Sequence, residues 1–393
     1  MSQQQINLSP DLKRLQDEGF EIEIRNGGHL IVHHIPYVNA KCEIHYGKLI
    51  APLTLNNNIA LRPSDHVIFF MGSYPCHNDG TEIQQLRHLN PNQTLFADIV
   101  LNYSFSNKPP NGYNDFYEKI VRYTDMISAS AKSIDNTVTA KTFKPILSNN
   151  FNDVFTYVDT NSSRANINFI NAKLNNQKVA IIGLGGTGSY ILDLVAKTPV
   201  AEIHLFDGDI LLQHNAFRCP GAVGIDDLEK QHYKVEYFAS VYSKMHKKII
   251  AHSVYVDDST LELLNGKTFV FICVDSNKAR NKIIASLLQK GIDFIDVGLG
   301  VNIVDDKLIG TVRTTTGTSS KNDHLSTRIG NIDFDDNEYA TNIQIADLNS
   351  LNANFAVIKW KKLCGFYQDL IGEHHTTYSI NASQLLNNDN TTV

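Results

Sequence analysis

The chain has 393 residues, of which 42% are hydrophobic and 19% are charged, with a formal net charge of −6. This balance is typical of a globular protein with room for two domains, and it excludes a disordered or fibrous chain. The negative charge argues against a general nucleic-acid binder, whose phosphate contacts need a basic excess. No apolar run approaches the ~18 residues of a membrane span, and the N-terminal residues lack the order of a secretory signal. We therefore expect neither a nucleic-acid nor a membrane partner.

The N-terminal part predicts an α+β domain over residues 1–150. Residues 20–105 consist of short apolar runs separated by Gly, Pro and Asn, which predicts a mainly β unit. From Asn114 to Ile134 apolar side chains recur at helical spacing, which predicts an amphipathic helix. A polar stretch near residue 150 is the expected boundary.

Two roles are open for this domain. It is either a recognition module or, by analogy of fold alone, a degenerate relative of the ubiquitin-conjugating fold. In the second case Cys76 is the candidate acyl acceptor. Its histidines and cysteines lack the close spacing of a structural zinc site, so we expect core and surface roles for them. These residues are His33, His34, His45, His66, His77, Cys42 and Cys76.

Residues 151–393 alternate between expected strands and helices. The expected strands are residues 178–183, 202–207, 267–275, 293–300 and, at the edge, 378–383; the expected helices are 188–198, 230–248, 277–290 and 343–366. Alternating β and α segments predict a doubly wound, Rossmann-like, mainly parallel sheet. In the last helix one apolar face is expected to pack in the core. Its residues are Ile345, Leu348, Leu351, Phe355 and Ile358.

A glycine loop follows the first of these strands and opens a helix. Gly183, Gly185, Gly186 and Gly188 occur in Gly-Leu-Gly-Gly-Thr-Gly, a spacing that suits a tight turn, close approach to phosphate and close helix–strand packing. Backbone N–H groups at the helix start favour an anion. Asp207 ends the next strand, where a carboxylate can accept hydrogen bonds from a ribose. The loop by itself leaves three possibilities open: an ATP enzyme, a nicotinamide enzyme and a turn without ligand.

The residues after Asp207 favour phosphoryl chemistry over hydride transfer. Asp209 is followed by Asn215 and Arg218, and Lys234 lies on the next expected helix. A cationic set suits a reaction in which charge develops on phosphate oxygens. Dehydrogenases have no general need for such a set at this place.

A further carboxylate, Asp275, ends the third strand at the edge where ligands bind in such sheets, and it suits Mg²⁺ held jointly with phosphates. Plainer roles stay open for each residue. Asn215 and Asp275 are candidate caps of a turn and a helix. Arg218 and Lys234 are candidate solvated charges, and Lys230 lies one helical turn from Lys234.

This ordered set resembles the ThiF, MoeB and ubiquitin-activating superfamily of adenylyltransferases, here with an extra N-terminal domain, over residues 156 to the end. The matching elements are the glycine loop, Asp207, Asp209, Asn215, Arg218, Lys234 and Asp275. The resemblance implies that ATP adenylates the C-terminal glycine carboxylate of a ubiquitin-like or sulfur-carrier protein and releases pyrophosphate. It also implies that Asp207 holds the ribose and that Asp275 holds Mg²⁺. The phosphates would be held by Asn215, Arg218 and Lys234.

The resemblance further implies a homodimer, in which Arg164 reaches the nucleotide of the opposite protomer. A conjugating-type enzyme is a further expected partner. Two other functions stay open: a non-catalytic scaffold that binds a ubiquitin-like protein, and an NAD-dependent oxidoreductase.

Thiol chemistry at a loop is not expected. Residues 311–340 are the expected loop that carries the thioester cysteine in ubiquitin-activating enzymes, and they contain no cysteine. Cys273 and Cys364 lie in an apolar strand and near a helix end, where packing is their expected role, and Cys219 is expected in a Cys-Pro turn. The scattered cysteines, without any Cys-x-x-Cys pair, indicate reduced thiols of a cytoplasmic protein.

Overall fold

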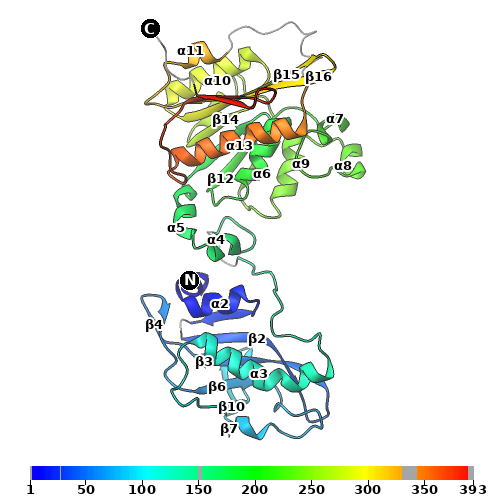
Figure 1. Cartoon of the computed structure of the whole chain (residues 1–393), viewed down its shortest axis with the longest axis vertical. Helices are drawn as coiled ribbons and strands as arrows, with labels where there is room; N and C mark the ends of the chain where they lie inside the picture. Colours follow the sequence, from blue (N-terminus) through cyan, green and yellow to red (C-terminus); the bar gives the residue numbers. More distant parts are fainter. Residues whose placement is uncertain (1, 27, 149–152, 330–342, 388–393) are drawn as a thin grey trace. The chain divides into compact units, whose positions relative to one another are not determined.

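The structure, a computed structural model, describes residues 2–26, 28–148, 153–329 and 343–387. The chain forms two compact units, Met1–Ile146 and Leu147–Val393. Figure 1 shows that the first unit consists mostly of strands, whereas strands and helices alternate in the second. None of the helices in the described ranges is long and apolar enough to cross a membrane.

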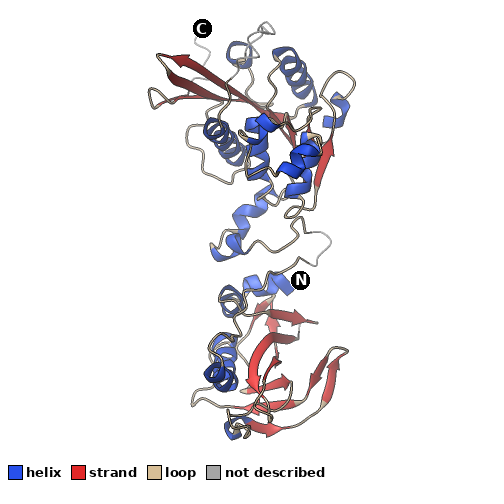
Figure 2. Ribbon diagram, turned by 90° about the vertical axis from the view of Figure 1, so that its right-hand side faces the viewer, coloured by secondary structure: helices blue, strands red, loops and turns tan. Residues whose placement is uncertain are grey.

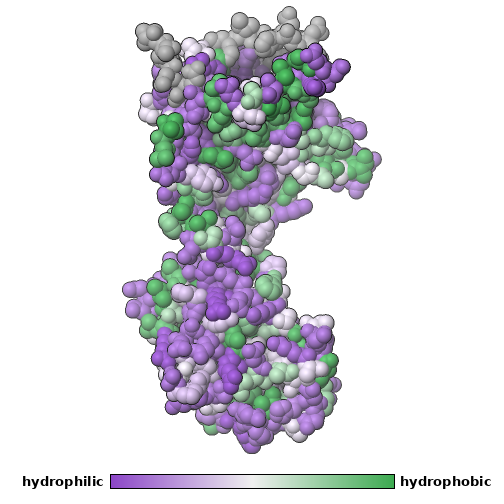
Figure 3. Space-filling view, viewed as in Figure 1, coloured by the Kyte–Doolittle hydropathy of each residue, from purple (hydrophilic) through white to green (hydrophobic). Residues whose placement is uncertain are grey.

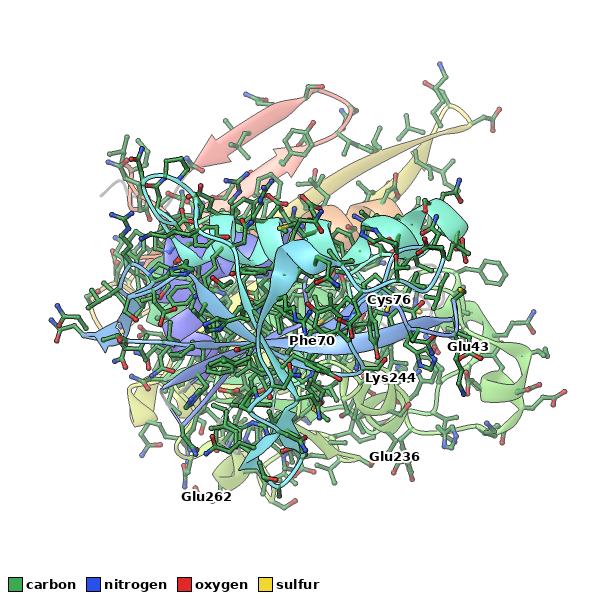
Figure 4. All side chains as sticks on the ribbon, turned by 90° about the horizontal axis from the view of Figure 1, so that it is seen from below. Glu43, Phe70, Cys76, Glu236, Lys244 and Glu262 are labelled. Carbon is green, nitrogen blue, oxygen red and sulfur yellow. The ribbon has the colours of Figure 1, made fainter. Side chains whose placement is uncertain are left out.

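The first unit is built on an antiparallel sheet with the strand order β1-β2-β3-β6-β10-β7. Its helices pack on one face, and a small β8–β9 hairpin covers apolar side chains of the other face. The elements are α1 (Ser2–Leu8), α2 (Pro10–Asp17), β1 (Ile22–Arg25), β2 (His29–Val38), β3 (Ile44–Pro52), β4 (Leu55–Asn56), β5 (Ile59–Ala60), β6 (Val67–Met71), β7 (Arg87–Leu89), β8 (Gln93–Phe96), β9 (Ile99–Leu101), β10 (Tyr103–Ser106) and α3 (Phe116–Ile134). Phe70, labelled in Figure 4, is fully buried in the centre of this sheet.

The long helix of this unit, α3, follows from its sequence. The carboxylate of Asp115 accepts a hydrogen bond from the backbone amide of Glu118 (2.7 Å) and so caps the helix. The side chains at helical spacing from Phe116 to Ala131 are buried against the sheet. Ile134, expected on the same face, is 48% exposed, because the helix ends there.

The second unit contains an eight-stranded mixed sheet with the order β13-β12-β11-β14-β15-β16-β17-β18. The first five strands are parallel and the last three antiparallel. The elements are α4 (Thr160–Arg164), α5 (Asn168–Asn171), β11 (Lys178–Ile182), α6 (Gly186–Val195), β12 (Glu202–Phe206), α7 (Gln213–Ala216), α8 (Ile225–Glu229), α9 (Lys234–Tyr242), β13 (Ile249–His252), β14 (Phe269–Ile272), α10 (Asn277–Lys290), β15 (Asp293–Val304), β16 (Lys307–Gly317), α11 (Leu325–Arg328), α13 (Ala346–Leu363), β17 (His375–Ser379) and β18 (Gln384–Asn387).

Helices cover both faces of this sheet. Side chains of α6, α9 and α13 form one core with the sheet, and α10 contributes to a second core on the opposite face. The central strands are continuous apolar runs because both of their faces are buried. This arrangement confirms the predicted α/β fold class, a doubly wound, mainly parallel sheet beside a separate N-terminal domain.

Several boundaries differ from the expectation. Residues 311–317, expected in a loop, belong to β16, because β15 and β16 form a long hairpin that extends from the sheet (Figure 2). Residues 330–340 of that expected loop lie outside the described residues. The expected helix at 230–248 is shorter and spans α9. The edge strand is β18 rather than residues 378–383, most of which precede it.

Four of the five residues of the predicted stripe pack in the core as expected, but a second face of α13 is buried more deeply. Ala353, Ala356 and Trp360 are fully buried in the main core, whereas Ile358 of the stripe is 43% exposed. Small residues on the buried face let α13 lie close against α6. The larger apolar residues of the stripe, Leu348 among them, pack on the β15–β17 part of the sheet.

Candidate active site

A tight turn carries the chain from β11 into α6. Gly183 has a backbone φ of +87°, which favours glycine. A Cβ atom on Gly183 would lie 2.6 Å from the carbonyl oxygen of Cys273, and one on Gly188 would lie 1.9 Å from that of Gly183. These two glycines therefore serve the turn and the close packing of α6 on the sheet.

Gly185 and Gly186 have different surroundings. A Cβ atom on Gly185 would meet no described atom within 4 Å, whereas one on Gly186 would lie 2.0 Å from Nδ2 of Asn349 on α13. Gly185 thus faces open space at the N-terminus of α6, where backbone N–H groups without helical partners favour an anion. Gly186 instead allows α13 to approach α6.

The carboxyl end of β12 holds two carboxylates and a lysine. Asp207 accepts hydrogen bonds from the backbone amides of Leu184 (2.6 Å) and Asp209 (2.9 Å), which tie the glycine loop to the strand end. Lys234 begins α9, and its Nζ lies 2.6 Å from Oδ2 of Asp209 and 3.7 Å from Oδ1 of Asp207. Tyr255 donates a hydrogen bond to Oδ1 of Asp209. Lys234 is 6% exposed, so it is not the solvated charge considered as its alternative.

Burial and hydrogen bonding shift the pKa values of these carboxylates in opposite directions. Burial raises the pKa of Asp207, although Lys234 and two backbone amides act to lower it. Burial also acts to raise the pKa of Asp209, but hydrogen bonds from Lys234 and Tyr255 outweigh it and lower the pKa. The same hydrogen bond raises the pKa of Tyr255 to about 12. A further hydrogen-bond donor, such as a ribose hydroxyl, would therefore stabilise the charged form of Asp207 more than that of Asp209.

The short helix α7 places Asn215 and Arg218 beyond the strand end. Oδ1 of Asn215 accepts a hydrogen bond from the backbone amide of Leu212 (2.9 Å), so the turn-capping role holds for this oxygen. Its buried Nδ2 and the buried Nε of Arg218 have no hydrogen-bond partner among the described residues. Buried donors without partners are costly, and they suit a ligand with acceptor oxygens. Of the two residues, Arg218 lines the cavity described below.

Asp275 follows β14 at the same edge of the sheet and is exposed. Helix α10 is capped by Ser276, whose hydroxyl accepts from the amide of Ala279 (3.2 Å), and not by Asp275. Within the described ranges no group of three or more His, Cys, Asp or Glu is arranged to hold a metal. A cation at Asp275 would therefore depend on ligand oxygens, as Mg²⁺ beside phosphates does.

One cavity of about 720 Å³ joins these groups. It lies at the carboxyl ends of β11, β12 and β14, the edge at which doubly wound sheets bind ligands. Charged groups form one wall: Asp207, Asp209, Arg218, Lys234, Asp275 and Arg280. Neutral residues of β15, of α13 and of the segment just before α13 form the other: Gly298, Gly300, Gln344, Asn349 and Asn352. The volume suits a nucleotide-sized ligand.

Residues 163–305 match the ThiF family, and residues 10–160 match a domain of unknown function, DUF6791. The second unit contains a ThiF family domain. The predicted resemblance to the ThiF family is thereby confirmed over residues 163–305. No curated protein matches the chain in sequence.

Solved structures resemble the chain at low identity. E. coli MccB with ATP is 19% identical, with 57% of this chain and 67% of that chain covered and a TM-score of 0.46. MccB with MccA-N7isoASN is 17% identical, with the same coverage and a TM-score of 0.48. PaaA is 16% identical, with 70% of this chain and 95% of that chain covered and a TM-score of 0.47.

Two basic residues of the ThiF domain lie apart from the cavity in the described part of a single chain. Arg164 ends α4 and is exposed. Lys230 has a side chain that is 58% exposed and lies 3.7 Å from a carboxylate oxygen of Asp227. The geometry therefore favours Lys234 over Lys230 as the cavity lysine, and Arg164 depends on a second chain for any role there.

The thiols of the second unit are poor nucleophiles. Burial raises the pKa of Cys219 and Cys273, and it raises that of Cys364 to about 11. A thiol with a raised pKa carries little thiolate at neutral pH. Cys76 of the first unit (labelled in Figure 4) is 1% exposed, and burial raises its pKa as well. Its surroundings oppose the acyl-acceptor role considered for it.

The tertiary structure adds residues that the sequence analysis missed. Arg280 on α10 lines the cavity and donates through Nε to Oδ1 of the fully buried Asp296 (2.8 Å), whose Oδ2 accepts from Arg313 (2.6 Å). Arg280 lies five positions after Asp275, and this closeness in sequence is a signal for its place at the site. Tyr255 carried no such signal, because a loop brings it to Asp209.

Proposed function

We propose that the ThiF domain adenylates the C-terminal glycine carboxylate of a ubiquitin-like or sulfur-carrier protein, with ATP as co-substrate. The observation that carries this proposal is the convergence of Asp207, Arg218, Lys234 and Asp275 on one cavity beside Gly185. These residues come from four separate segments, and their charges match the hydroxyls and oxygens of a nucleoside triphosphate. A nicotinamide enzyme has no general need for Arg218 and Lys234.

Each group has a proposed task. Asp207 accepts hydrogen bonds from the ribose, and the backbone amides beside Gly185 bind phosphate oxygens. Arg218 and Lys234 hold the remaining phosphate charge, with Lys234 exchanging part of its contact with Asp209 for the ligand. Asp275 is the proposed ligand of Mg²⁺, which supplies charge neutralisation to the phosphates when bound.

The proposed reaction is a substitution at phosphorus. An oxygen of the glycine carboxylate forms a bond to the α-phosphorus, and the bond from that phosphorus to the bridging oxygen of pyrophosphate breaks. The electron pair of that bond leaves with pyrophosphate, and no proton transfer is required. Arg218 and Lys234 stabilise the charge that develops on the phosphate oxygens.

We propose a cytoplasmic homodimer as the working form. Exposed apolar side chains lie on and beside α7 and α8, the segment that carries Arg218, and green side chains gather there in Figure 3. They include Leu212 (47% exposed), Phe217 (78%) and Ile225 (68%). A second copy is the proposed occupant, since Arg164 then has a neighbouring site to reach. A conjugating-type enzyme is the proposed later partner.

The test is ATP–pyrophosphate exchange with a small glycine-ended protein encoded in the neighbouring genes. We expect exchange that depends on that protein and falls at least 100-fold in Arg218→Ala, while Lys230→Ala retains it. Titration calorimetry with ATP and with NAD distinguishes the proposed adenylyltransferase from the oxidoreductase alternative. If wild type and Arg218→Ala bound ATP equally and neither catalysed exchange, the result would support the non-catalytic scaffold instead.

A further inference from the structure

Two asparagines of α13 line the cavity, and each has a buried side-chain atom that lacks a partner among the described residues. Asn349 is 1% exposed and Asn352 is fully buried, and both line the cavity. Nδ2 of Asn349 and Oδ1 of Asn352 have no hydrogen-bond partner in the described part of the chain. Because the residues are three apart on one helix, the two atoms share a face.

The remaining atoms of the two amides fix their orientation. Oδ1 of Asn349 accepts from the hydroxyl of Thr187 on α6 (3.0 Å). Nδ2 of Asn352 donates to the backbone carbonyl of Gly298 on β15 (3.0 Å). One donor, on Asn349, and one acceptor, on Asn352, therefore remain unpartnered in residues that line the cavity.

This donor–acceptor pair does not match a phosphate. Phosphate and carboxylate oxygens are acceptors, so Oδ1 of Asn352 would find no donor on such a group. A peptide unit, in contrast, presents one carbonyl and one N–H. Leaving either asparagine atom unpaired costs free energy, so the site favours an occupant that pairs with both.

We propose that Asn349 and Asn352 form the subsite for the main chain at the C-terminus of the acyl substrate. Asn349 donates to a peptide carbonyl, and Asn352 accepts from the N–H of the terminal residue. This inference rests on the proposed adenylation and specifies how its substrate is held.

The position and shape of this wall agree with that role. Asn349 lies against Gly186, the first residue of α6, and so beside the space at Gly185 assigned to phosphate. Gly300 on β15 lines the same wall, and a Cβ atom there would meet no described atom within 4 Å. The glycines and neutral amides of this wall leave room for an extended main chain next to the α-phosphate.

The experiment uses two stable mimics of the adenylate and the full chain. Both are sulfamoyl adenosines acylated with acetyl-Gly-Gly, and in the second an ester oxygen replaces the N–H between the two glycines. Titration calorimetry measures their affinities and that of ATP for the wild type, Asn349→Ala and Asn352→Ala. Asn354→Ala is the matched control, because it is exposed on the same helix and bonds to Ser350.

We expect the wild type to bind the amide probe about 10-fold more tightly than the ester probe, the effect of one hydrogen bond to a buried acceptor. Asn352→Ala should bind both probes equally, and Asn349→Ala should weaken both, with ATP affinity unchanged in each. Equal wild-type affinity for the two probes would overturn the subsite, even if Asn352→Ala did not fold. A parallel loss of ATP affinity would assign the pair to the nucleotide. A wild type that binds neither ATP nor the probes would overturn the proposed function itself.

Discussion

Lys234 compensates two carboxylates at once at the end of β12. It contacts Asp209 at 2.6 Å and lies 3.7 Å from Asp207, and its side chain is buried. The pair with Asp209 is partly open to solvent, since that carboxylate is half exposed. Its loss is therefore expected to cost less than the full value of a buried ion pair.

Lys234→Met should lower the free energy of unfolding by about 2 kcal/mol at pH 7. Without the ammonium group the folded-state pKa values of Asp207 and Asp209 rise. These raised pKa values stabilise the folded variant at low pH, and that stabilisation is lost as the pH rises. The stability deficit of Lys234→Met relative to wild type should therefore shrink toward pH 4. Urea unfolding at both pH values measures it, with the exposed Lys230→Met as control. A deficit that did not change with pH would contradict this role.

Gly185→Val should weaken ATP binding about 10-fold or more while the melting temperature is retained, because the new side chain occupies the phosphate space. Gly186→Val should instead destabilise the unit by about 1–3 kcal/mol, because its Cβ atom would lie 2.0 Å from Asn349. Calorimetry and thermal unfolding separate the two effects. If Gly185→Val lost stability and Gly186→Val lost ATP affinity, the phosphates would lie beside Gly186.

We expect His246 to make the second unit sensitive to acid. Burial lowers its pKa to about 4, and its ring accepts from the amide of Lys248 (3.2 Å) while Nε2 donates to the carbonyl of Val200 (3.0 Å). The unfolded state binds the proton first, so stability should fall by about 2 kcal/mol from pH 7 to pH 5 through this group. His246→Gln should lose that part of the pH dependence in urea unfolding, whereas the exposed His77→Gln should keep it. An unchanged pH slope in His246→Gln would refute the assignment.

At the scale of elements, Asp296 ties three of them together. Its carboxylate on β15 accepts from Arg280 of α10 and Arg313 of β16, and it is fully buried. One negative charge between two guanidinium groups is a network whose parts depend on one another.

Asp296→Asn should lower the free energy of unfolding of the second unit by about 3–5 kcal/mol, since the buried Arg280 and the partly buried Arg313 lose their anion. Asp305→Asn, at the exposed tip of the same hairpin, is the control and should change it by less than about 0.5 kcal/mol. Urea unfolding followed by the fluorescence of Trp360, which lies in this unit, measures both. Equal stability of the two variants would show that the network contributes nothing.

At the scale of the whole molecule, the cavity belongs entirely to the second unit, and Arg164 stands apart from it. An Arg164→Ala chain and an Asp207→Ala chain should each be poorly active. When they are co-expressed, part of the exchange activity should return, because one interface then carries two intact halves. Pyrophosphate exchange by isolated mixed dimers measures this. A monomer in solution, or mixed dimers without recovery, would remove Arg164 from the site.

The sequence by itself determined the alternation of strands and helices, the glycine loop and its family. These features are local: Gly183 to Gly188 must follow a buried strand, and Asp207 and Asp275 end strands whose apolar runs are visible in the sequence. Parallel strands bring such ends to one edge, so most of the charged wall was predictable from chain order.

Only the tertiary structure decided which neutral residues form the second wall of the cavity and which residues contact one another there. Asn349 and Asn352 lie on a helix whose sequence does not reveal which face meets the cavity, and the small residues Ala353 and Ala356 set the buried face. The two glycines at 185 and 186 are alike in sequence, but α13 approaches only one of them closely. Long-range packing brings α13, β15 and the loop of Tyr255 to the glycine turn, and contacts of this kind depend on shape and burial that no local pattern encodes.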